Sequence, residues 1–220
     1  ATGLDGHADI FIKDGKIKTV SNDIKPNNHT RVIDATARYV IPGLIDCHVH
    51  LREPGLEYKE TIETGSRAAA VGGYTTLICE PNTLPPIDSL EMVASFMERV
   101  NQKGVVNIYT KACITKGLLG EELTDIAKLA TDKRVRALSD DGNPVFYESL
   151  MKRACELAAQ NKLIISPHCE DSQISRDKAK TNTTVAHFPG KSCCHETHFV
   201  IRQIKYTEQA RGWLHVSHVS

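Results

Sequence analysis

The sequence of 220 residues has no net charge, because 27 lysine and arginine residues balance 27 aspartate and glutamate residues. Binding to nucleic acid or to an acidic membrane surface through charge requires a basic excess, so this balance argues against both partners. No apolar run approaches the roughly 18 residues that suggest a membrane span. The first residues also lack the basic-then-apolar pattern of a secretory leader. We therefore expect no partnership with nucleic acid or membrane.

The cysteines form no regular pattern. There are seven of them, an odd number, and the adjacent Cys193 and Cys194 belong to no CxxC pair, which excludes a zinc ribbon. Scattered thiols of this kind are typical of a protein kept in a reducing compartment. We therefore expect a cytoplasmic protein with free cysteines.

Residues 1–43 are interpreted as part of a small β-sandwich domain. Residues 8–13 and 16–20 alternate between apolar and polar side chains on either side of Asp14 and Gly15, which is a strong hairpin signal. Residues 31–34 are a further strand-like segment, and residues 39–43 close this region.

From Leu44 onward, segments typical of strands and helices alternate. Strands are expected at 44–50, 74–80, 105–114, 135–138, 163–167 and 213–219, and helices at 57–70, 89–102, 121–131, 145–160 and 195–211. This alternation requires parallel strands joined by helical crossovers. Two architectures satisfy it, the open doubly wound sheet and the closed (β/α)8 barrel.

Two observations favour the barrel. The first expected strand is not followed by the glycine-rich phosphate loop of a nucleotide-binding sheet. In addition, polar residues stand at the C-terminal ends of several strands, namely His48, His50, Asn82, Asp140, Asp141, His168 and His218. In a barrel these ends converge on the active-site face. We therefore predict an α/β fold with a TIM-type (β/α)8 barrel over residues 44–220, of which strands one to six are present.

Both ends of the sequence suggest a longer protein. The sequence does not begin with Met, and it stops at Ser220 within an expected strand. Six strands also leave a (β/α)8 barrel two strands short. We expect that residues are missing at both ends.

Four histidines are expected at the mouth of the barrel. His48 and His50 lie two apart on one strand, so both imidazoles leave the same face, and neutral imidazoles are good ligands for zinc. Such a pair alone also fits one buried core histidine and one solvated histidine. Because His168 and His218 end two further strands, we interpret all four as metal ligands. His215 lies an odd number of residues before His218, so we interpret it as structural.

Asp140 and Asp141 follow the fourth expected strand. Two metal ions close together need a bridging anion, and one of these carboxylates is the candidate, with a plain Asp-Asp-Gly turn as the alternative. Asp46 shares a face with His48 and is a candidate carboxylate partner of the ligands. Lys111 lies within the third strand rather than at its mouth, so we do not assign it as a carbamylated bridge.

Arg52 and Asn82 are candidates for substrate binding. A guanidinium two residues beyond His50 suits a substrate carboxylate, which it can bind bidentately, and Asn82 can add an amide donor. A surface arginine and a turn-forming asparagine are the alternatives, and these two residues alone do not decide between them.

The sequence closely resembles the dihydroorotases of the amidohydrolase superfamily. The resemblance extends over nearly the whole chain and is carried by VIPGLIDCHVHLREPG, AAAVGGYTTLICEPNT, SDDG, HCED and HVSHVS. Hydantoinases share the two histidines of the first motif but usually lack the arginine that follows. Many family members bridge their metals with a carbamylated lysine, whereas this sequence looks like a bacterial branch with an aspartate in a DDG segment.

The resemblance implies roles for individual residues. His48 and His50 would hold one zinc ion, His168 and His218 would hold a second, and the spacing to the later histidine favours Asp141 as the bridge. By the same resemblance Arg52 and Asn82 would bind the substrate carboxylate. The general acid/base of the family is an aspartate after strand eight, which has no counterpart up to Ser220. We therefore expect the 220-residue chain alone to be inactive.

The implied function is that of a dihydroorotase in de novo pyrimidine (UMP) biosynthesis, which interconverts N-carbamoyl-L-aspartate and L-dihydroorotate plus water. Hydroxide bridging the two metals would attack the ring carbonyl. The alternatives are a hydantoinase, dihydropyrimidinase or allantoinase, and a non-catalytic dihydroorotase-like partner subunit, although such subunits usually lose the metal histidines. The resemblance also implies a homo-oligomer acting on a small molecule and allows a complex with aspartate transcarbamoylase.

Overall fold

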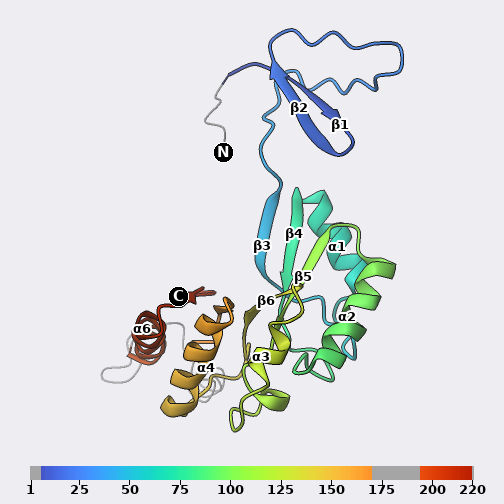
Figure 1. Ribbon diagram of the computed structural model, residues 1–220. Helices are drawn as coiled ribbons and strands as arrows, with labels where there is room; N and C mark the ends of the chain where they lie inside the picture. The colour runs from blue at the N-terminus through green and yellow to red at the C-terminus, as the bar shows by residue number, and fades with distance from the viewer. Residues whose placement is uncertain (1–5, 170–193, 220) are drawn as a thin grey trace, which may run out of the picture. The chain divides into compact units, whose positions relative to one another are not determined.

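The computed structural model of the protein describes residues 6–169 and 194–219 (Figure 1). The chain divides into two compact units, one ending at Pro42 and the other beginning at Gly43. None of the described helices is both long and apolar enough to cross a membrane.

The first unit contains a two-stranded antiparallel sheet of β1 (Asp9–Lys13) and β2 (Lys16–Ser21). Asp14 and Gly15 between the strands both have positive φ, as the two central residues of a type I′ turn require. The predicted hairpin is therefore confirmed.

The strand predicted at residues 31–34 is wrong, because this segment has no strand conformation. Asp34 Oδ1 instead accepts a hydrogen bond of 2.9 Å from Thr36 N and turns the chain. A strand also needs a neighbour that completes its hydrogen bonds, and β1 and β2 are the only paired strands in the described part of this unit. The β-sandwich assignment of residues 1–43 stays a prediction.

The second unit is built on a parallel sheet with the strand order β3-β4-β5-β6-β7-β8. Its strands are β3 (Leu44–Val49), β4 (Tyr74–Cys79), β5 (Asn107–Ala112), β6 (Val135–Leu138), β7 (Ile164–Ile165) and β8 (Trp213–Leu214). Each strand pairs with the previous one in the chain, so every crossover moves in the same direction. A doubly wound sheet reverses direction at a switch point, whereas a (β/α)8 barrel does not.

The crossover segments form helices that pack beside the strands. They are α1 (Ile62–Val71), α2 (Leu90–Lys103), the 3-10 helix η1 (Lys116–Leu118), α3 (Ile126–Leu129), α4 (Glu148–Gln160) and α6 (Cys194–Gln209). Helix α1 contacts β4, α2 contacts β5, α4 contacts β7 and α6 contacts β8. Neighbouring helices also contact one another, from α1 to α2 and from α3 through α4 to α6 (Figure 1). This arrangement matches the outer helical layer of a barrel.

Local caps explain where the helices differ from the predicted ranges. Thr61 accepts a hydrogen bond from Thr64 N as the N-cap of α1, so this helix begins at Ile62 rather than at residue 57. Helix α3 is much shorter than the predicted 121–131. Asp125 is its N-cap and accepts a hydrogen bond of 3.0 Å from Lys128 N, and Leu123, within the predicted range, forms a β-bridge with Thr115 instead. Ser89 caps α2 by accepting a hydrogen bond of 3.3 Å from Met92 N, close to the predicted start of this helix.

The hydrophobic core lies between the sheet and these helices. It contains strand residues such as Leu77, Leu138 and Ile165 and helix residues such as Phe96 and Met151, all of which are buried. Burying each such side chain stabilises the fold by roughly 1.5–3 kcal/mol. The helical layer and the sheet are therefore fixed firmly, and the loops after the strands are placed by this scaffold.

Candidate metal centre

His48, in β3, and His50, just beyond it, present their Nε2 atoms to the carboxylate of Asp141. Nε2 of His48 lies 3.7 Å from Asp141 Oδ1, and Nε2 of His50 lies 3.4 Å from Asp141 Oδ2. The two rings meet edge to face, with centroids 5.2 Å apart. Asp46, a candidate partner of the ligands, accepts a hydrogen bond from the backbone N–H of His48, so its observed contact is with the chain at the end of β3.

His168, beyond β7, and His218, beyond β8, reach the same carboxylate from the other end of the strand order. His168 Nδ1 and His218 Nε2 each lie 3.4 Å from Asp141 Oδ1 and 3.3 Å from one another. The strand predicted at 213–219 ends already at Leu214, and His218 has a φ of 36°. Both His215 and His218 therefore lie beyond the strand, so the alternation of side chains along a strand does not determine where they point. His215 belongs to neither candidate metal-binding group of the described residues, as expected.

Asp141 is common to both groups of candidate ligands. His48 and His50 form one group with Asp141, and His168 and His218 form the other, with the ligand atoms of each group within 4.8 Å of one another. Burial alone would raise the pKa of Asp141, but the contact with His168 and the charges of His48 and His50 outweigh burial and hold the pKa well below its usual range.

Asp140, the neighbouring carboxylate, points to backbone instead. Its Oδ1 accepts hydrogen bonds from Ile114 N at 2.7 Å and Thr115 N at 3.1 Å, and its Oδ2 accepts one from Thr115 Oγ1. Burial raises the pKa of Asp140 to about 6 even though these donors favour its ionised form. Asp140 therefore anchors the loop after β6 to the loop after β5.

These donors fit two divalent metal ions. Imidazole nitrogens and a carboxylate oxygen are the usual protein ligands of zinc and of similar ions. A metal binds the neutral imidazole, and burial lowers the pKa of His50, which favours that form. The structure thus supplies a suitable donor set, and burial favours the metal-binding form of His50.

Arg52 lies beside the cluster with its charge uncompensated. Its positive charge contributes to lowering the pKa of His50, although burial of the imidazole has the larger effect. Within the described residues the half-buried guanidinium has no hydrogen bond or ion pair. Arg52 has a φ of 59° in a tight turn closed by Leu56 N and Arg52 O at 3.1 Å. A free cation at the edge of a cluster of ligands suits an anionic substrate.

The loop that carries Arg52 is packed on the loop after β4. Gly55 has a φ of 90°, and a side chain there would collide with the backbone carbonyl of Leu84. Glu53 is buried and ion-paired with Lys103, and it accepts a hydrogen bond of 3.2 Å from Ile62 N. These contacts hold the backbone of Arg52 in place.

Asn82 connects a histidine to the central carboxylate. Its Oδ1 lies 3.0 Å from His50 Nδ1, while its Nδ2 donates to Asp141 Oδ2 at 2.9 Å and to the Asp141 carbonyl at 3.3 Å. The amide of Asn82 is therefore committed to the candidate ligands. Its predicted contact with a substrate stays a prediction.

Glu80 and Lys111 were not among the candidate site residues, yet both are buried close to the cluster. Glu80 follows β4 and contacts His48, and Lys111 lies in β5 and contacts Glu80. Parallel strands covered on both faces are normally apolar, so a lysine within such a strand was the available signal.

The Dihydro-orotase-like family matches residues 37–220. The chain belongs to this family. The expected resemblance to dihydroorotases is thereby confirmed. Curated relatives include Dihydroorotase of Thermoanaerobacter sp. (strain X514), 41% identical, and Dihydroorotase of Acetivibrio thermocellus, 40% identical. These matches cover 99% and 100% of this chain but 51% and 52% of the relatives, so the chain spans about half of their length.

Solved structures confirm the predicted α/β barrel fold of the TIM type. L-Hydantoinase (Dihydropyrimidinase) from Arthrobacter aurescens is similar with a TM-score of 0.80 and 24% identity, covering 97% of this chain and 49% of that one. A D-hydantoinase is similar with a TM-score of 0.77 and 26% identity, covering 97% and 48%. The parallel strands β3 to β8 are the corresponding part of the barrel in this chain.

Proposed function

We propose that the protein is a dihydroorotase, which interconverts N-carbamoyl-L-aspartate and L-dihydroorotate plus water in pyrimidine biosynthesis. The observation that carries this proposal is the uncompensated guanidinium of Arg52 beside His50, at the edge of a cluster centred on Asp141. Both compounds carry a carboxylate, for which such a guanidinium is a suitable partner. The curated relatives named Dihydroorotase support the same function.

We propose that His48 and His50 hold one zinc ion, that His168 and His218 hold a second, and that Asp141 bridges them. When bound, the two ions would polarise the amide carbonyl of the ring and lower the pKa of a bound water. The chain itself orients this chemistry. Asn82 fixes His50 by accepting its Nδ1 hydrogen, and Arg52 places the ring by binding its carboxylate.

A hydantoinase-type activity is the second candidate, because the structural relatives are hydantoinases. Such a substrate offers the same cyclic amide without the carboxylate. The two candidates therefore differ in what Arg52 contributes.

The test compares hydrolysis of dihydroorotate, dihydrouracil and hydantoin by the zinc-loaded, full-length protein and its Arg52→Met variant. We expect dihydroorotate to be preferred and kcat/KM for it to fall on the order of 100-fold in the variant, because charge-assisted hydrogen bonds of about 1.5–3 kcal/mol are lost. Metal content should not change. Arg67→Met removes an exposed arginine from α1 and is the matched control.

Preferred hydrolysis of dihydrouracil or hydantoin, unchanged in Arg52→Met, would refute the dihydroorotase proposal and support the second candidate.

We further propose that the protein is a cytoplasmic homo-oligomer and that it forms a complex with aspartate transcarbamoylase. Sedimentation of the full-length protein, alone and with aspartate transcarbamoylase, tests these assemblies. Among the described residues, Cys47, Cys79 and three further cysteines form no disulfide, which is consistent with a reducing compartment.

A further inference from the structure

A buried ion pair lies directly beneath the candidate metal ligands. Lys111, in β5, and Glu80, just after β4, are each 1% exposed. Lys111 Nζ contacts Glu80 Oε1 and donates a hydrogen bond of 2.7 Å to Ser166 Oγ. Removing two charges from water costs several kcal/mol per ion, and apolar residues of similar size often stabilise a core at least as well. Stability alone therefore gives little reason for this pair.

Glu80 also lies against a candidate ligand. Its Oε1 is 2.9 Å from Nδ1 of His48, on the opposite side of the ring from the Nε2 that faces Asp141. Both His48 Nδ1 and Glu80 Oε2 are buried, and neither has a hydrogen-bond partner among the described residues. A buried donor and a buried acceptor thus lie side by side. An imidazole that coordinates through Nε2 carries its hydrogen on Nδ1 and usually donates it to a carboxylate or carbonyl.

The same pair reaches the second group of ligands. Ser166, which Lys111 contacts, lies 3.2 Å through its Oγ from Ser217 Oγ. Ser166 stands two residues before His168, and Ser217 stands immediately before His218. The contacts of Lys111 therefore connect the ends of β4, β7 and β8 below the cluster.

We propose that Glu80 and Lys111 are positioning residues of the metal centre, an inference that rests on the proposed metal-dependent function. Glu80 accepts the Nδ1 hydrogen of His48 and directs Nε2 toward Asp141. Lys111 holds the Glu80 carboxylate in that orientation and, through Ser166 and Ser217, fixes the chain that carries His168 and His218.

The experiment separates positioning from stability with a double substitution. In Glu80→Met/Lys111→Met the ion pair is replaced by apolar side chains of similar length. We expect the metal-free double variant of the full-length protein to unfold at a urea concentration close to that of the wild type. Co²⁺ alone, titrated and followed by its visible absorption, should nevertheless bind about 10–100-fold more weakly.

Two further variants sharpen the comparison. Glu80→Gln keeps an oxygen acceptor for His48 and should recover part of the lost affinity. Arg134→Met disrupts the ion pair with Asp132 just ahead of β6, at the opposite end of this strand from Asp141, so it should leave Co²⁺ affinity unchanged. Nitrogen-15 NMR of the imidazoles should show the Nδ1–H tautomer of His48 in the wild type and a mixture of tautomers in the double variant.

Unchanged Co²⁺ affinity in the double variant, with an unchanged His48 tautomer, would overturn the positioning role. A wild-type protein that binds Co²⁺ but does not turn over dihydroorotate would refute only the proposed substrate, because the affinity comparison still decides the role of Glu80 and Lys111. A wild-type protein that binds no Co²⁺ would overturn both proposals.

Discussion

Asp140 and Asp141 are neighbours in the chain, but their carboxylates serve different parts of the structure. Asp140 accepts hydrogen bonds from the backbone N–H groups of Ile114 and Thr115, while Asp141 lies within 3.4 Å of three of the four histidines of the cluster and 3.7 Å from His48. One aspartate holds the loop and the other occupies the centre of the site. Their substitutions should therefore have separable effects.

We expect Asp141→Ala to lose most of the bound metal, because both groups of candidate ligands share this carboxylate. Asp140→Ala should keep more metal but lose stability, since each backbone N–H left unpaired costs about 1–3 kcal/mol. Elemental analysis and urea unfolding measure the two effects. If Asp140→Ala were the variant that loses the metal, the bridging role would belong to Asp140.

The pKa of Asp140 leads to a prediction on pH for the metal-free protein. Burial raises this pKa from 3.8 to about 6, so between these values the folded state binds more protons than the unfolded state. The wild type should therefore lose stability relative to Asp140→Asn as the pH rises from 4 to 7, by an amount on the order of 3 kcal/mol. Urea unfolding at both pH values gives the difference. A change of opposite sign would mean that the backbone donors outweigh burial.

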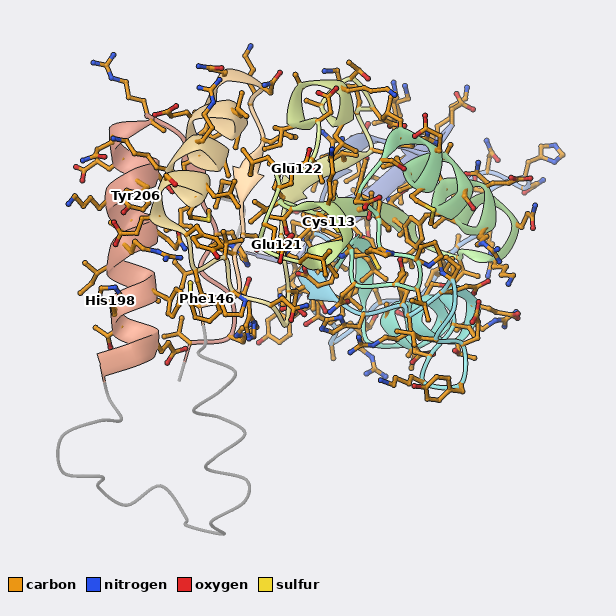
Figure 2. All side chains as sticks on the ribbon, turned by 90° about the horizontal axis from the view of Figure 1, so that it is seen from below. Cys113, Glu121, Glu122, Phe146, His198 and Tyr206 are labelled. Carbon is orange, nitrogen blue, oxygen red and sulfur yellow. The ribbon has the colours of Figure 1, made fainter. Side chains whose placement is uncertain are left out.

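Arg202 in α6 secures the other end of the loop that carries Asp141. Its guanidinium is buried and donates to the carbonyls of Val145 at 2.6 Å and Phe146 at 3.0 Å. Phe146 itself lies against α6 (Figure 2), and the centroid of its ring is 5.7 Å from that of Phe199. Burial lowers the pKa of Arg202, in line with a desolvated cation.

Arg202→Met should therefore cost about 2–4 kcal/mol in the free energy of unfolding, because two buried carbonyls lose their donor. Metal affinity should fall as well, since the loop of Asp141 loses its anchor on α6. Lys205→Met, an exposed change on the same helix, is the control and should stay within about 0.5 kcal/mol of the wild type. Equal stability of the two variants would contradict the anchoring role.

The strands of the barrel could be predicted because their signals are local. Apolar runs that end in a polar residue indicate the C-terminal ends of parallel strands, and His48, Asn82 and Asp141 stand at such ends. The segment at residues 31–34 shows the limit of this approach. Its alternation is typical of a strand, but a strand also requires a neighbouring strand to bind, which the local sequence does not reveal.

The contact between Glu80 and Lys111 could not be predicted, because it depends on the register of two strands. Cys79 in β4 pairs with Thr110 in β5, and this register places the next residue of each strand side by side. A shift of one residue would turn each side chain to the opposite face of the sheet. His215 shows a related limit, because β8 ends at Leu214 and alternation does not extend beyond it.

Asn82 gives the last prediction, because its amide bonds both to a candidate ligand and to the central carboxylate. Asn82→Ala leaves Nδ1 of His50 without its acceptor, so Co²⁺ affinity should fall about 10–100-fold. Arg52→Lys keeps the charge but loses the planar fork, so it should lower kcat/KM for dihydroorotate while metal content stays normal. The substitution at Asn82 should therefore lower metal affinity, whereas the substitution at Arg52 should lower kcat/KM without changing metal affinity. A variant Asn82→Ala with wild-type Co²⁺ affinity and a raised KM would assign Asn82 to the substrate alone.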